Sequence, residues 1–425
     1  MKKRYVQVGT GGRARFYYEA IAKDFKETSE IVGFCDVSQT RMAYANRVIH
    51  EKYGCPKVPT YFYTDFEQML DDLQPDCVIV TSVDRTHHDY IIRAMRKGYD
   101  VVCEKPLTID EEKAKAILKA QKETGRNLRV TFNYRYAAHN TKIRELLAQD
   151  TIGTVFSVHF EWLLNTSHGA DYFRRWHRNK YNSGGLLVHK STHHFDLVNF
   201  WLQTVPKKVF ALGALNFYGM KNAEQRGVKE FYARAYGSEA AKRDPFALDL
   251  ESSKELRELY LKAEEDSGYI RDRSVFSDDI SIEDTMAVTV QYENNAMLSY
   301  SLNAYMPYEG FKVAFNGSKG RIEMTIIEKS YVNAGGKKED EGALAFQEIT
   351  VYPLFAPSYQ VDITEMAGGH GGGDPILLQD IFGEKTEDIW NRSADHIDGV
   401  MSILTGIAAN QSIATGQSVT LKELL

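Results

Sequence analysis

The chain has 425 residues, too many for one ordinary hydrophobic core, so its length predicts two domains. Its 43% hydrophobic and 26% charged residues are typical of a soluble globular protein. A formal net charge of −6 leaves no surplus of cations to neutralise phosphates, which argues against nucleic acid as a partner.

The sequence shows no sign of membrane insertion or secretion. It contains no apolar stretch of the roughly 20 residues needed to span a bilayer, and its start lacks a signal-peptide core. The four cysteines, at positions 35, 55, 77 and 103, lack CxxC spacing and suggest buried thiols in a reducing compartment. We therefore expect a cytoplasmic protein with no membrane partner.

Residues 1–136 alternate short apolar runs with helical patterns. The runs at 5–9, 30–36, 77–82, 100–105 and 128–133 are predicted strands, each separated from the next by helical sequence. This alternation predicts a doubly wound parallel sheet of Rossmann type, covered by helices on both faces.

Residues 137–425 have a different texture. Longer segments that alternate with period two, at 154–164, 284–294, 296–306 and 311–317, predict a large open, mostly antiparallel sheet in an α+β domain. The charge-rich residues 219–280 are predicted to form a helical insertion, and residues 393–415 a final helix.

A glycine-rich turn follows the first strand. Gly9-x-Gly11-x-x-Ala14, with Gly12 and Arg13 inside it, leads into a helix whose free N–H groups suit a pyrophosphate. Asp36 ends the second strand, where a carboxylate binds ribose hydroxyls and repels a 2′-phosphate. The pattern favours NAD over NADP, although Arg13 or Arg41 could meet a phosphate. The alternative is a turn that only reverses the chain.

Two further segments carry groups suited to chemistry. Glu104-Lys105-Pro106 lies at the carboxyl end of a predicted strand, where ligands of parallel sheets bind, so Lys105 could stabilise a developing alkoxide; the alternative is a surface lysine. Residues 184–196 place His189 and His193 four apart on one predicted helix, with Lys190 and His194 displaced by about 100°.

Three interpretations of this histidine helix stay open: a metal site, a structural helix, and an acid/base site. Two histidines at this spacing could bind zinc with His177, Glu161 or His370, but the glutamate of the HExxH motif is missing, so we expect no metal. The acid/base interpretation is preferred. Side chains that suit a carbohydrate, with aromatic faces and charged or polar donors, are Arg175, Trp176, His177 and His194.

Taken in order, these segments resemble the Gfo/Idh/MocA family of oxidoreductases. The matching pieces are VGTGGRA, Asp36, SVDRTHH (82–88), CEKPL, FNYRY (132–136) and GGLLVHKSTHHFDLVNFWL. The resemblance implies NAD or NADP, a sugar or polyol substrate, and a homodimer or homotetramer assembled through the open sheet. It implies that Lys105 is the active-site lysine. The implied cofactor contacts include Ser82, His87, Glu104, Lys105 and Arg135.

Two departures from the family pattern stand out. The chain has Ser82-Val83-Asp84 where the family usually shows Thr-Pro-Asn, and His189 stands at the aspartate of its Asp-x-x-x-His pair, whose histidine aligns with His193. Neighbouring imidazoles resist joint protonation, and Lys190 adds a further cation. We therefore expect a neutral His193 that acts as base, with His189 or Lys190 holding the substrate.

The sequence thus predicts an NAD(H)-dependent oxidoreductase acting on a secondary hydroxyl of a sugar, glycoside or polyol. His193 would take the hydroxyl proton and Lys105 would stabilise the alkoxide. Two alternatives remain. One is an NAD-dependent glycosidase that works by transient oxidation and elimination. The other is a non-catalytic NAD-binding sensor, against which the presence of Lys105 and His193 counts.

Overall fold

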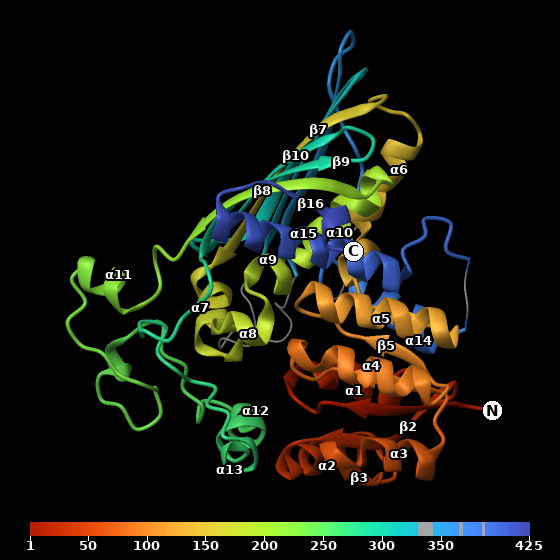
Figure 1. The fold of residues 1–425 in the computed structure, drawn as a ribbon, viewed down its shortest axis with the longest axis vertical. Coiled ribbons are helices and arrows are strands. Elements are labelled where there is room, and N and C mark those ends of the chain that lie inside the picture. The colour runs from red at the N-terminus through yellow and green to blue at the C-terminus, as the bar shows by residue number, and fades with distance from the viewer. Residues whose placement is uncertain (330–342, 365–368, 385–386) are drawn as a thin grey trace.

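The computed structural model describes residues 1–329, 343–364, 369–384 and 387–425 and contains two sheets, one above the other in Figure 1. The first sheet has the strand order β15-β6-β5-β4-β1-β2-β3. Its strands are β1 (Lys3–Val8), β2 (Ser29–Asp36), β3 (Thr60–Phe62), β4 (Cys77–Val80), β5 (Asp100–Cys103), β6 (Leu128–Val130) and β15 (Ala394–Asp395). The first six pair in parallel in the Rossmann order, which confirms the predicted fold class.

Helices of the first half connect these strands. They are α1 (Arg15–Lys23), α2 (Gln39–Tyr53), α3 (Phe66–Leu73), α4 (His87–Arg96) and α5 (Glu111–Thr124). Because all six parallel strands run the same way, Gly9, Asp36, Ser82 and Lys105 follow strand ends along one edge of the sheet. Each of the four was predicted from its position after an apolar run.

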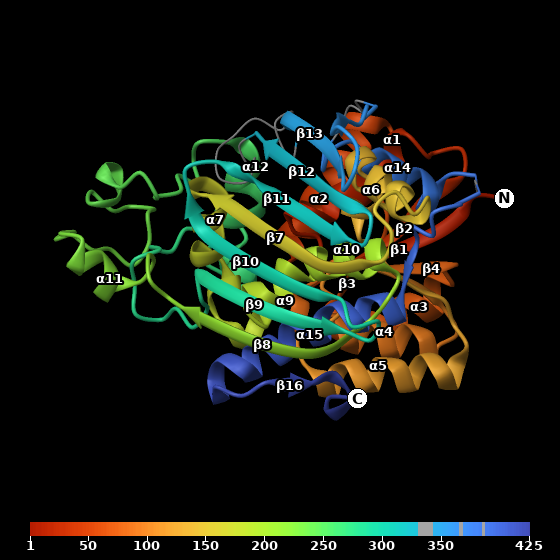
Figure 2. The ribbon, with the colours of Figure 1, turned by 90° about the horizontal axis from the view of Figure 1, so that it is seen from above.

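The second sheet is larger and has the order β14-β13-β12-β11-β7-β10-β9-β8-β16. Its strands are β7 (Val155–Asn165), β8 (Pro206–Ala214), β9 (Thr285–Tyr292), β10 (Met297–Met306), β11 (Glu309–Gly317), β12 (Gly320–Glu328), β13 (Leu344–Pro353), β14 (Tyr359–Gln360) and β16 (Val419–Thr420). All pairs are antiparallel except β7 with β10. Figure 2 shows the helices behind this sheet and its other face open.

Helices of the second half fill the space between the two sheets. They are α6 (Ala138–Ala148), α7 (Thr166–Arg174), α8 (Lys180–Ser183), α9 (Leu186–His189), α10 (Ser191–Leu202), α14 (Gly373–Phe382) and α15 (His396–Thr415). Two late segments of the chain pack against the first sheet. Strand β15 pairs with β6, and Phe382 of α14 packs on Tyr5 and Tyr17. Among the described residues no helix is both long enough and apolar enough to cross a bilayer.

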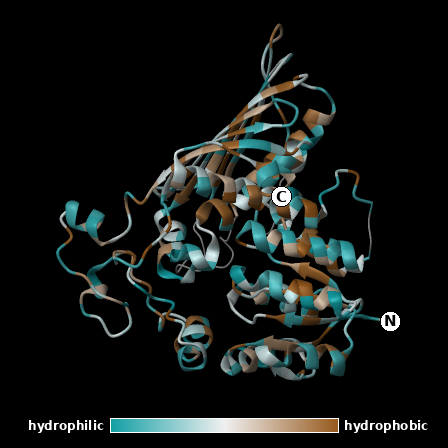
Figure 3. Ribbon diagram, viewed as in Figure 1, coloured by the Kyte–Doolittle hydropathy of each residue, from teal (hydrophilic) through white to brown (hydrophobic). Residues whose placement is uncertain are grey.

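Two local expectations were wrong. The predicted helix through His189 and His193 is interrupted: α9 ends at His189 and α10 begins at Ser191. The predicted helical insertion, 219–280, is mostly irregular. Its helical pieces are short: α11 (Met220–Gln225), a 3₁₀ turn at Ala241–Arg243, α12 (Lys254–Leu256), a π-turn at Arg257–Leu261 and α13 (Glu264–Ser267). Hydrophilic residues predominate along the α11 arm in Figure 3, so it has little apolar surface with which to stabilise longer helices.

Candidate functional site

A cavity of about 1520 Å³ runs along the carboxyl edge of the first sheet and under the second half of the chain. The predicted residues that line it are Gly9, Gly11, Gly12, Arg13, Asp36, Ser82, His87, Glu104, Lys105, Arg175, Trp176, His177, His189, Lys190 and His193. The structure thus brings the glycine turn, the EKP segment and most of the histidine segment to one space.

The glycine turn has the close packing that a nucleotide loop requires. Gly9 has φ +85°, and a Cβ built there would lie 2.6 Å from the backbone of Thr81, so a side chain is excluded. Gly11 faces open space, with nothing within 4 Å of a built Cβ. This turn is therefore shaped for a group that approaches the backbone, as the pyrophosphate of NAD does.

Asp36 is fixed at the end of β2 by its neighbours. Its Oδ2 accepts hydrogen bonds from Thr10 N at 2.5 Å and Thr10 Oγ1 at 2.9 Å, and its Oδ1 accepts from Ser38 N at 2.9 Å. The carboxylate lines the cavity where ribose hydroxyls would lie. The accepting carboxylate of Asp36 and the glycine turn both fit NAD.

The two arginines that could have met a 2′-phosphate both contact protein groups. Arg13 donates to Glu104 Oε1 at 2.5 Å, and Arg41 donates through Nε to the Leu259 carbonyl at 3.0 Å. Arg13 is thus held by Glu104, whereas Arg41 lines the cavity with its Nη1 4.0 Å from Asp36 and its buried Nη2 without a hydrogen-bond partner among the described residues.

A segment of the second half covers this end of the cavity. We call residues 254–269 the strap; Figure 1 shows its α12 and α13 beside α2. Leu259 and Tyr260 pack with Tyr44 in a buried apolar cluster, and Asp266 accepts hydrogen bonds from Ser38 Oγ at 2.6 Å and Thr40 N at 2.9 Å. Ion pairs join Arg15 to Glu255 and Arg47 to Glu258.

The strap also reaches the glycine turn itself. A Cβ built on Gly12 would lie 2.7 Å from the Tyr260 hydroxyl, and Glu255, Tyr260, Ser267 and Tyr269 line the cavity. None of these contacts was predicted, because the polar composition of the strap indicates only a solvent-exposed segment. The nucleotide end is therefore built from both halves of the chain.

Lys105 occupies the middle of the cavity. Its Nζ lies 3.4 Å from the His189 carbonyl oxygen, and burial together with nearby Lys190 lowers its pKa to about 8, against the opposing pull of Glu104 and Asp84. Glu104 accepts from Arg13, from Tyr17 Oη at 2.7 Å and from Lys105 N at 3.0 Å. Burial raises the pKa of Glu104, but Arg13 and Lys105 outweigh it and the pKa stays below its ordinary value.

His87 connects the loops that follow β4 and β5. Its Nδ1 lies 2.8 Å from the Pro106 carbonyl oxygen and its Nε2 3.0 Å from the Ser82 carbonyl oxygen. These contacts fix the position of the EKP segment relative to the Ser82 turn. The prediction that His87 contacts the cofactor stays a prediction.

His189 and His193 have different surroundings. Nδ1 of His189 lies 2.5 Å from Oδ2 of Asp84, whereas Nδ1 of His193 is buried without a hydrogen-bond partner. Burial, followed by Lys105, lowers the pKa of both rings well below the ordinary value. The sequence predicts that His189 and Lys190 lower the pKa of His193, but the main cause in the structure is burial.

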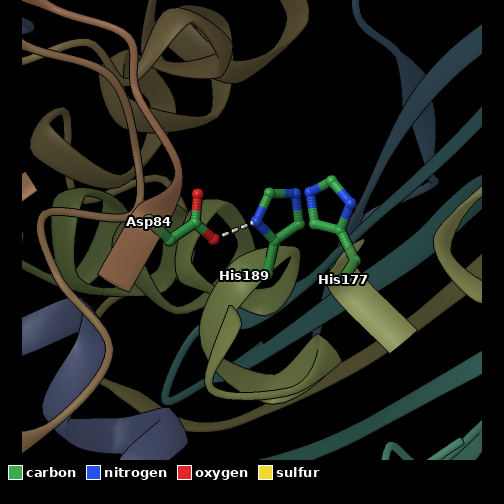
Figure 4. A group of neighbouring side chains, drawn as sticks. All are labelled: Asp84, His177 and His189. Atoms are coloured by element: carbon green, nitrogen blue, oxygen red, sulfur yellow. Dashed lines mark hydrogen bonds and ion pairs between the residues drawn. The ribbon is translucent and has the colours of Figure 1, made fainter. Parts of the chain in front are cut away.

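Asp84 is the residue that sequence reasoning missed. It lies in the turn after β4, and one donor atom from each of Asp84, His177 and His189 lies within 4.8 Å of the other two (Figure 4). His177 was among the possible metal ligands considered, but the carboxylate from the other half of the chain was not expected. The signal in the sequence was that Asp84 stands where the family usually has Asn.

Two predicted contacts are corrected. Arg135, expected to bind cofactor, does not line the cavity: it donates to both oxygens of Asp196, at 2.6 and 2.8 Å, and forms an ion pair with Asp398. His194, expected to bind substrate, is fully buried, stacks on Trp162 at 3.8 Å between ring centroids, and lies 2.6 Å from Tyr300 Oη through its Nδ1. Both residues hold packing together away from the cavity.

Further side chains surround the part of the cavity that holds Lys105: His168 and Tyr172, which were not predicted, and His370, which was considered as a metal ligand. Tyr172 and His168 line the cavity, with His168 Nε2 2.9 Å from Tyr172 Oη and His168 Nδ1 2.8 Å from Glu309. His370 also lines it and lies 2.9 Å from Asp374. Hydrogen-bonding groups therefore surround Lys105 and Lys190 on several sides.

Comparison with known proteins identifies the family. The family model described as the oxidoreductase family, NAD-binding Rossmann fold, matches residues 3–132, and that of its C-terminal alpha/beta domain matches residues 144–421. The chain belongs to the Gfo/Idh/MocA oxidoreductase family. Its first domain is accordingly an NAD-binding Rossmann domain, as predicted.

Relatives support this assignment. YteT of Bacillus subtilis, described only as a candidate oxidoreductase, is 36% identical over 99% of this chain and 98% of its own length. Inositol 2-dehydrogenase of Rhizobium meliloti is 32% identical over 51% of this chain and 59% of its own length. The WlbA dehydrogenase of Bordetella pertussis, solved with NADH and UDP-GlcNAcA, is 17% identical with a TM-score of 0.63, over 99% of each chain, and shares the fold.

Proposed function

We propose that this chain is an NAD(H)-dependent dehydrogenase that oxidises a secondary hydroxyl of a sugar, glycoside or polyol, or reduces the corresponding ketone. The observation that carries the proposal is the shared cavity: Lys105 and the histidine segment face the same space as the glycine turn and Asp36. The name of the inositol 2-dehydrogenase relative supports a polyhydroxylated substrate.

The residues around the cavity would have different roles. Lys105 would stabilise negative charge on the substrate oxygen, because its buried ammonium acts in a low-dielectric space. His193 holds the family position of the proton acceptor, while Lys190, Arg175, Trp176 and His177 would bind hydroxyls and sugar faces. NAD, when bound, accepts or supplies the hydride.

A panel of polyols, free sugars and glycosides tests the proposal. Each compound is incubated with NAD or NADH, with absorbance of NADH and chromatography of the products as readouts. At least one compound should give stoichiometric ketone and NADH. NADH binding with no turnover on any compound of the panel would contradict the proposal.

The strap gives a second candidate a specific basis. Because residues 254–269 cover the nucleotide end, NAD would exchange slowly, and slow exchange suits an enzyme that reoxidises its own NADH within one turnover. Such an enzyme would be an NAD-dependent glycosidase acting by oxidation and elimination. It would release free sugar from a glycoside without accumulating NADH, which the same panel detects.

We also propose that the open face of the second sheet joins subunits into a homodimer or homotetramer. This face is free of helices in Figure 2, and apolar side chains of its strands are exposed, among them Phe210, Leu212 and Met297. Exposed apolar groups in one continuous sheet favour association. Light scattering on the purified chain measures the mass, and a monomer would contradict this expectation.

A further inference from the structure

The two departures from the family pattern contact each other. Asp84, where the family usually has Asn, lies on the Rossmann side of the cavity, and His189, where the family usually has Asp, lies at the end of α9 on the other side. The carboxylate expected on the helix is thus on the opposite wall, and an imidazole has taken its place. A contact between the two altered positions points to one shared role.

The geometry orients His189 toward a ligand. Oδ2 of Asp84 lies 2.5 Å from Nδ1 of His189, and the two side chains are only 4% and 10% exposed. Figure 4 shows this pair in line, with His177 on the side of His189 that faces away from Asp84. Because Asp84 occupies Nδ1 and His189 lines the cavity, Nε2, on the side of the ring where His177 lies at 4.1 Å between centroids, is the nitrogen left for a substrate hydroxyl.

His193 lacks these features. The ring lies against the edges of Phe132 and Tyr134, at 5.9 and 5.1 Å between centroids, and its buried Nδ1 has no partner. Lys105 and Lys190 both oppose a positive charge on it. A proton taken up by His193 would therefore have, among the described residues, no carboxylate hydrogen-bonded to Nδ1, such as Asp84 provides for His189.

We propose that His189, oriented and charge-compensated by Asp84, is the base that takes the hydroxyl proton in this chain. The inference rests on the proposed function and replaces His193 in that role. On oxidation the hydroxyl proton moves to Nε2 of His189, the hydrogen on the same carbon leaves with its electron pair to NAD, and the carbon–oxygen double bond forms. Asp84 balances the imidazolium charge, and reduction reverses each transfer.

The surroundings keep His189 ready to accept a proton. Burial, followed by Lys105, Arg175 and Lys190, holds the pKa of His189 well below its ordinary value. Burial also raises the pKa of Asp84 well above its ordinary value, against the opposing effect of Lys105 and Arg175, so the two side chains compete for one proton. The titratable groups around it are Asp84, Lys105, Arg175, Lys190, His87 and His177. A neutral imidazole with one free nitrogen is the form that a base requires.

A metal ion is the competing use of the same atoms. Asp84, His177 and His189 supply a donor set that zinc accepts. Lys105, Lys190 and Arg175 would repel a divalent cation at this point, since all three act on His177, His189 or His193 through space. The charges therefore favour the proton-transfer role, and metal content becomes an outcome of the test.

Exchange of the two altered residues tests the inference. Wild type, Asp84→Asn, His189→Asp and the double variant Asp84→Asn/His189→Asp are assayed with NAD and the panel compound that wild type oxidises fastest, starting from myo-inositol. NADH fluorescence titration checks that each variant still folds and binds nucleotide. The double variant recreates the family pattern, with a carboxylate four residues before His193.

Asp84→Asn should lower kcat by roughly 10²- to 10⁴-fold, as loss of the orienting carboxylate does in other Asp–His pairs, with NADH affinity within about threefold of wild type. His189→Asp alone should also be inactive, because two buried carboxylates then face each other. The double variant should exceed both single variants by at least about tenfold, because the Asp-x-x-x-His pair of the family is restored.

Two results would overturn the inference: an Asp84→Asn kcat within about threefold of wild type, or one tightly bound metal per chain whose removal by EDTA abolishes turnover and whose return restores it. If wild type binds NADH but oxidises no panel compound, the proposed function fails separately. The pair is then judged by ¹⁵N-histidine NMR of the full chain. A strongly deshielded Nδ1 proton lost in Asp84→Asn supports it, and absence of that proton overturns it.

Discussion

The two ends of the cavity are assembled in different ways. At the nucleotide end, Gly9, Asp36 and Ser82 lie at the ends of three neighbouring strands of one sheet, β1, β2 and β4, so each lies where a short local motif places it. At the chemical end, Asp84, Lys105, His177 and His189 come from separate segments that meet only through packing of the two halves. The groups that local motifs predict at the nucleotide end thus come from one sheet, which the strap then covers, whereas the chemical end exists only where the two halves pack together.

The junction between the halves should be the most sensitive position. Arg135 and Asp196 are 3% and 1% exposed and form a two-pronged ion pair, so Arg135→Ala leaves a buried carboxylate with no partner of that strength. Loss of one partner of a buried pair costs about 3–5 kcal/mol of the free energy of unfolding. Urea denaturation followed by tryptophan fluorescence measures it.

The matched control is Lys142→Ala, which removes a half-buried i,i+3 pair with Glu145 and should cost about 0–1 kcal/mol. A junction role predicts that Arg135→Ala retains NADH affinity under conditions where it is folded. If instead the variant is as stable as wild type but binds NADH poorly, Arg135 contacts the cofactor after all.

Lys105→Met should separate the two ends functionally. The substitution removes the ammonium while keeping a chain of similar length, so kcat should fall by roughly 10²- to 10³-fold, the usual effect of removing one charge-stabilising group. NADH affinity should stay within about threefold of wild type, by fluorescence titration. Lys97→Met, which removes a surface partner of Asp71, is the control and should leave kcat unchanged.

The same contrast decides what could be predicted from sequence. The parallel sheet, the glycine turn and Lys105 follow from strand–helix alternation and from residues adjacent in the chain. Arg135 was placed wrongly, because its neighbour Asp196 lies on α10 and only packing brings the two together. His194 was misplaced for a similar reason: the break at Lys190 and the partner Tyr300 on β10 decide where its ring points.

The strap marks another limit of the sequence. Runs of charged residues in 219–280 have helical composition, yet the segment forms only short helical turns. Within it, the strap packs beside α2 through Leu259, Tyr260 and Asp266. The sequence shows that Asp84 is unusual, but it does not show that Asp84 contacts His189. The two residues are 105 positions apart and meet only through packing of the two halves.

Asp36→Asn tests the nucleotide end directly. The amide keeps the size of the side chain but loses the charge that strengthens hydrogen bonds to ribose hydroxyls, worth about 1.5–3 kcal/mol. NADH affinity should therefore fall by about 10- to 100-fold, while the ratio of NADPH to NADH affinity rises because the repelling charge is gone. Isothermal titration with both nucleotides gives this ratio. An unchanged ratio would mean that another group excludes the 2′-phosphate.

Asp266→Asn tests whether the strap slows the release of nucleotide from the cavity. Asp266 holds Ser38 and the start of α2, and weakening these hydrogen bonds by about 0.5–1.5 kcal/mol should speed NADH dissociation about 2- to 10-fold. Stopped-flow displacement of NADH by excess NAD measures the rate. Glu265→Gln, at an exposed neighbouring position, is the control. Equal rates in both variants would show that the strap does not retain the nucleotide.

The smallest effect concerns the charge state of Lys105. Burial and Lys190 depress its pKa to about 8, so the ammonium is present below that pH and is lost as the pH rises through it. If the charged form stabilises the alkoxide, kcat/KM should decline above about pH 8, a limb that reports the free enzyme. Lys105→Arg stays charged throughout and should lose this limb, whereas Lys190→Arg should keep it. A limb that persists in Lys105→Arg would assign the titration to another group at the chemical end.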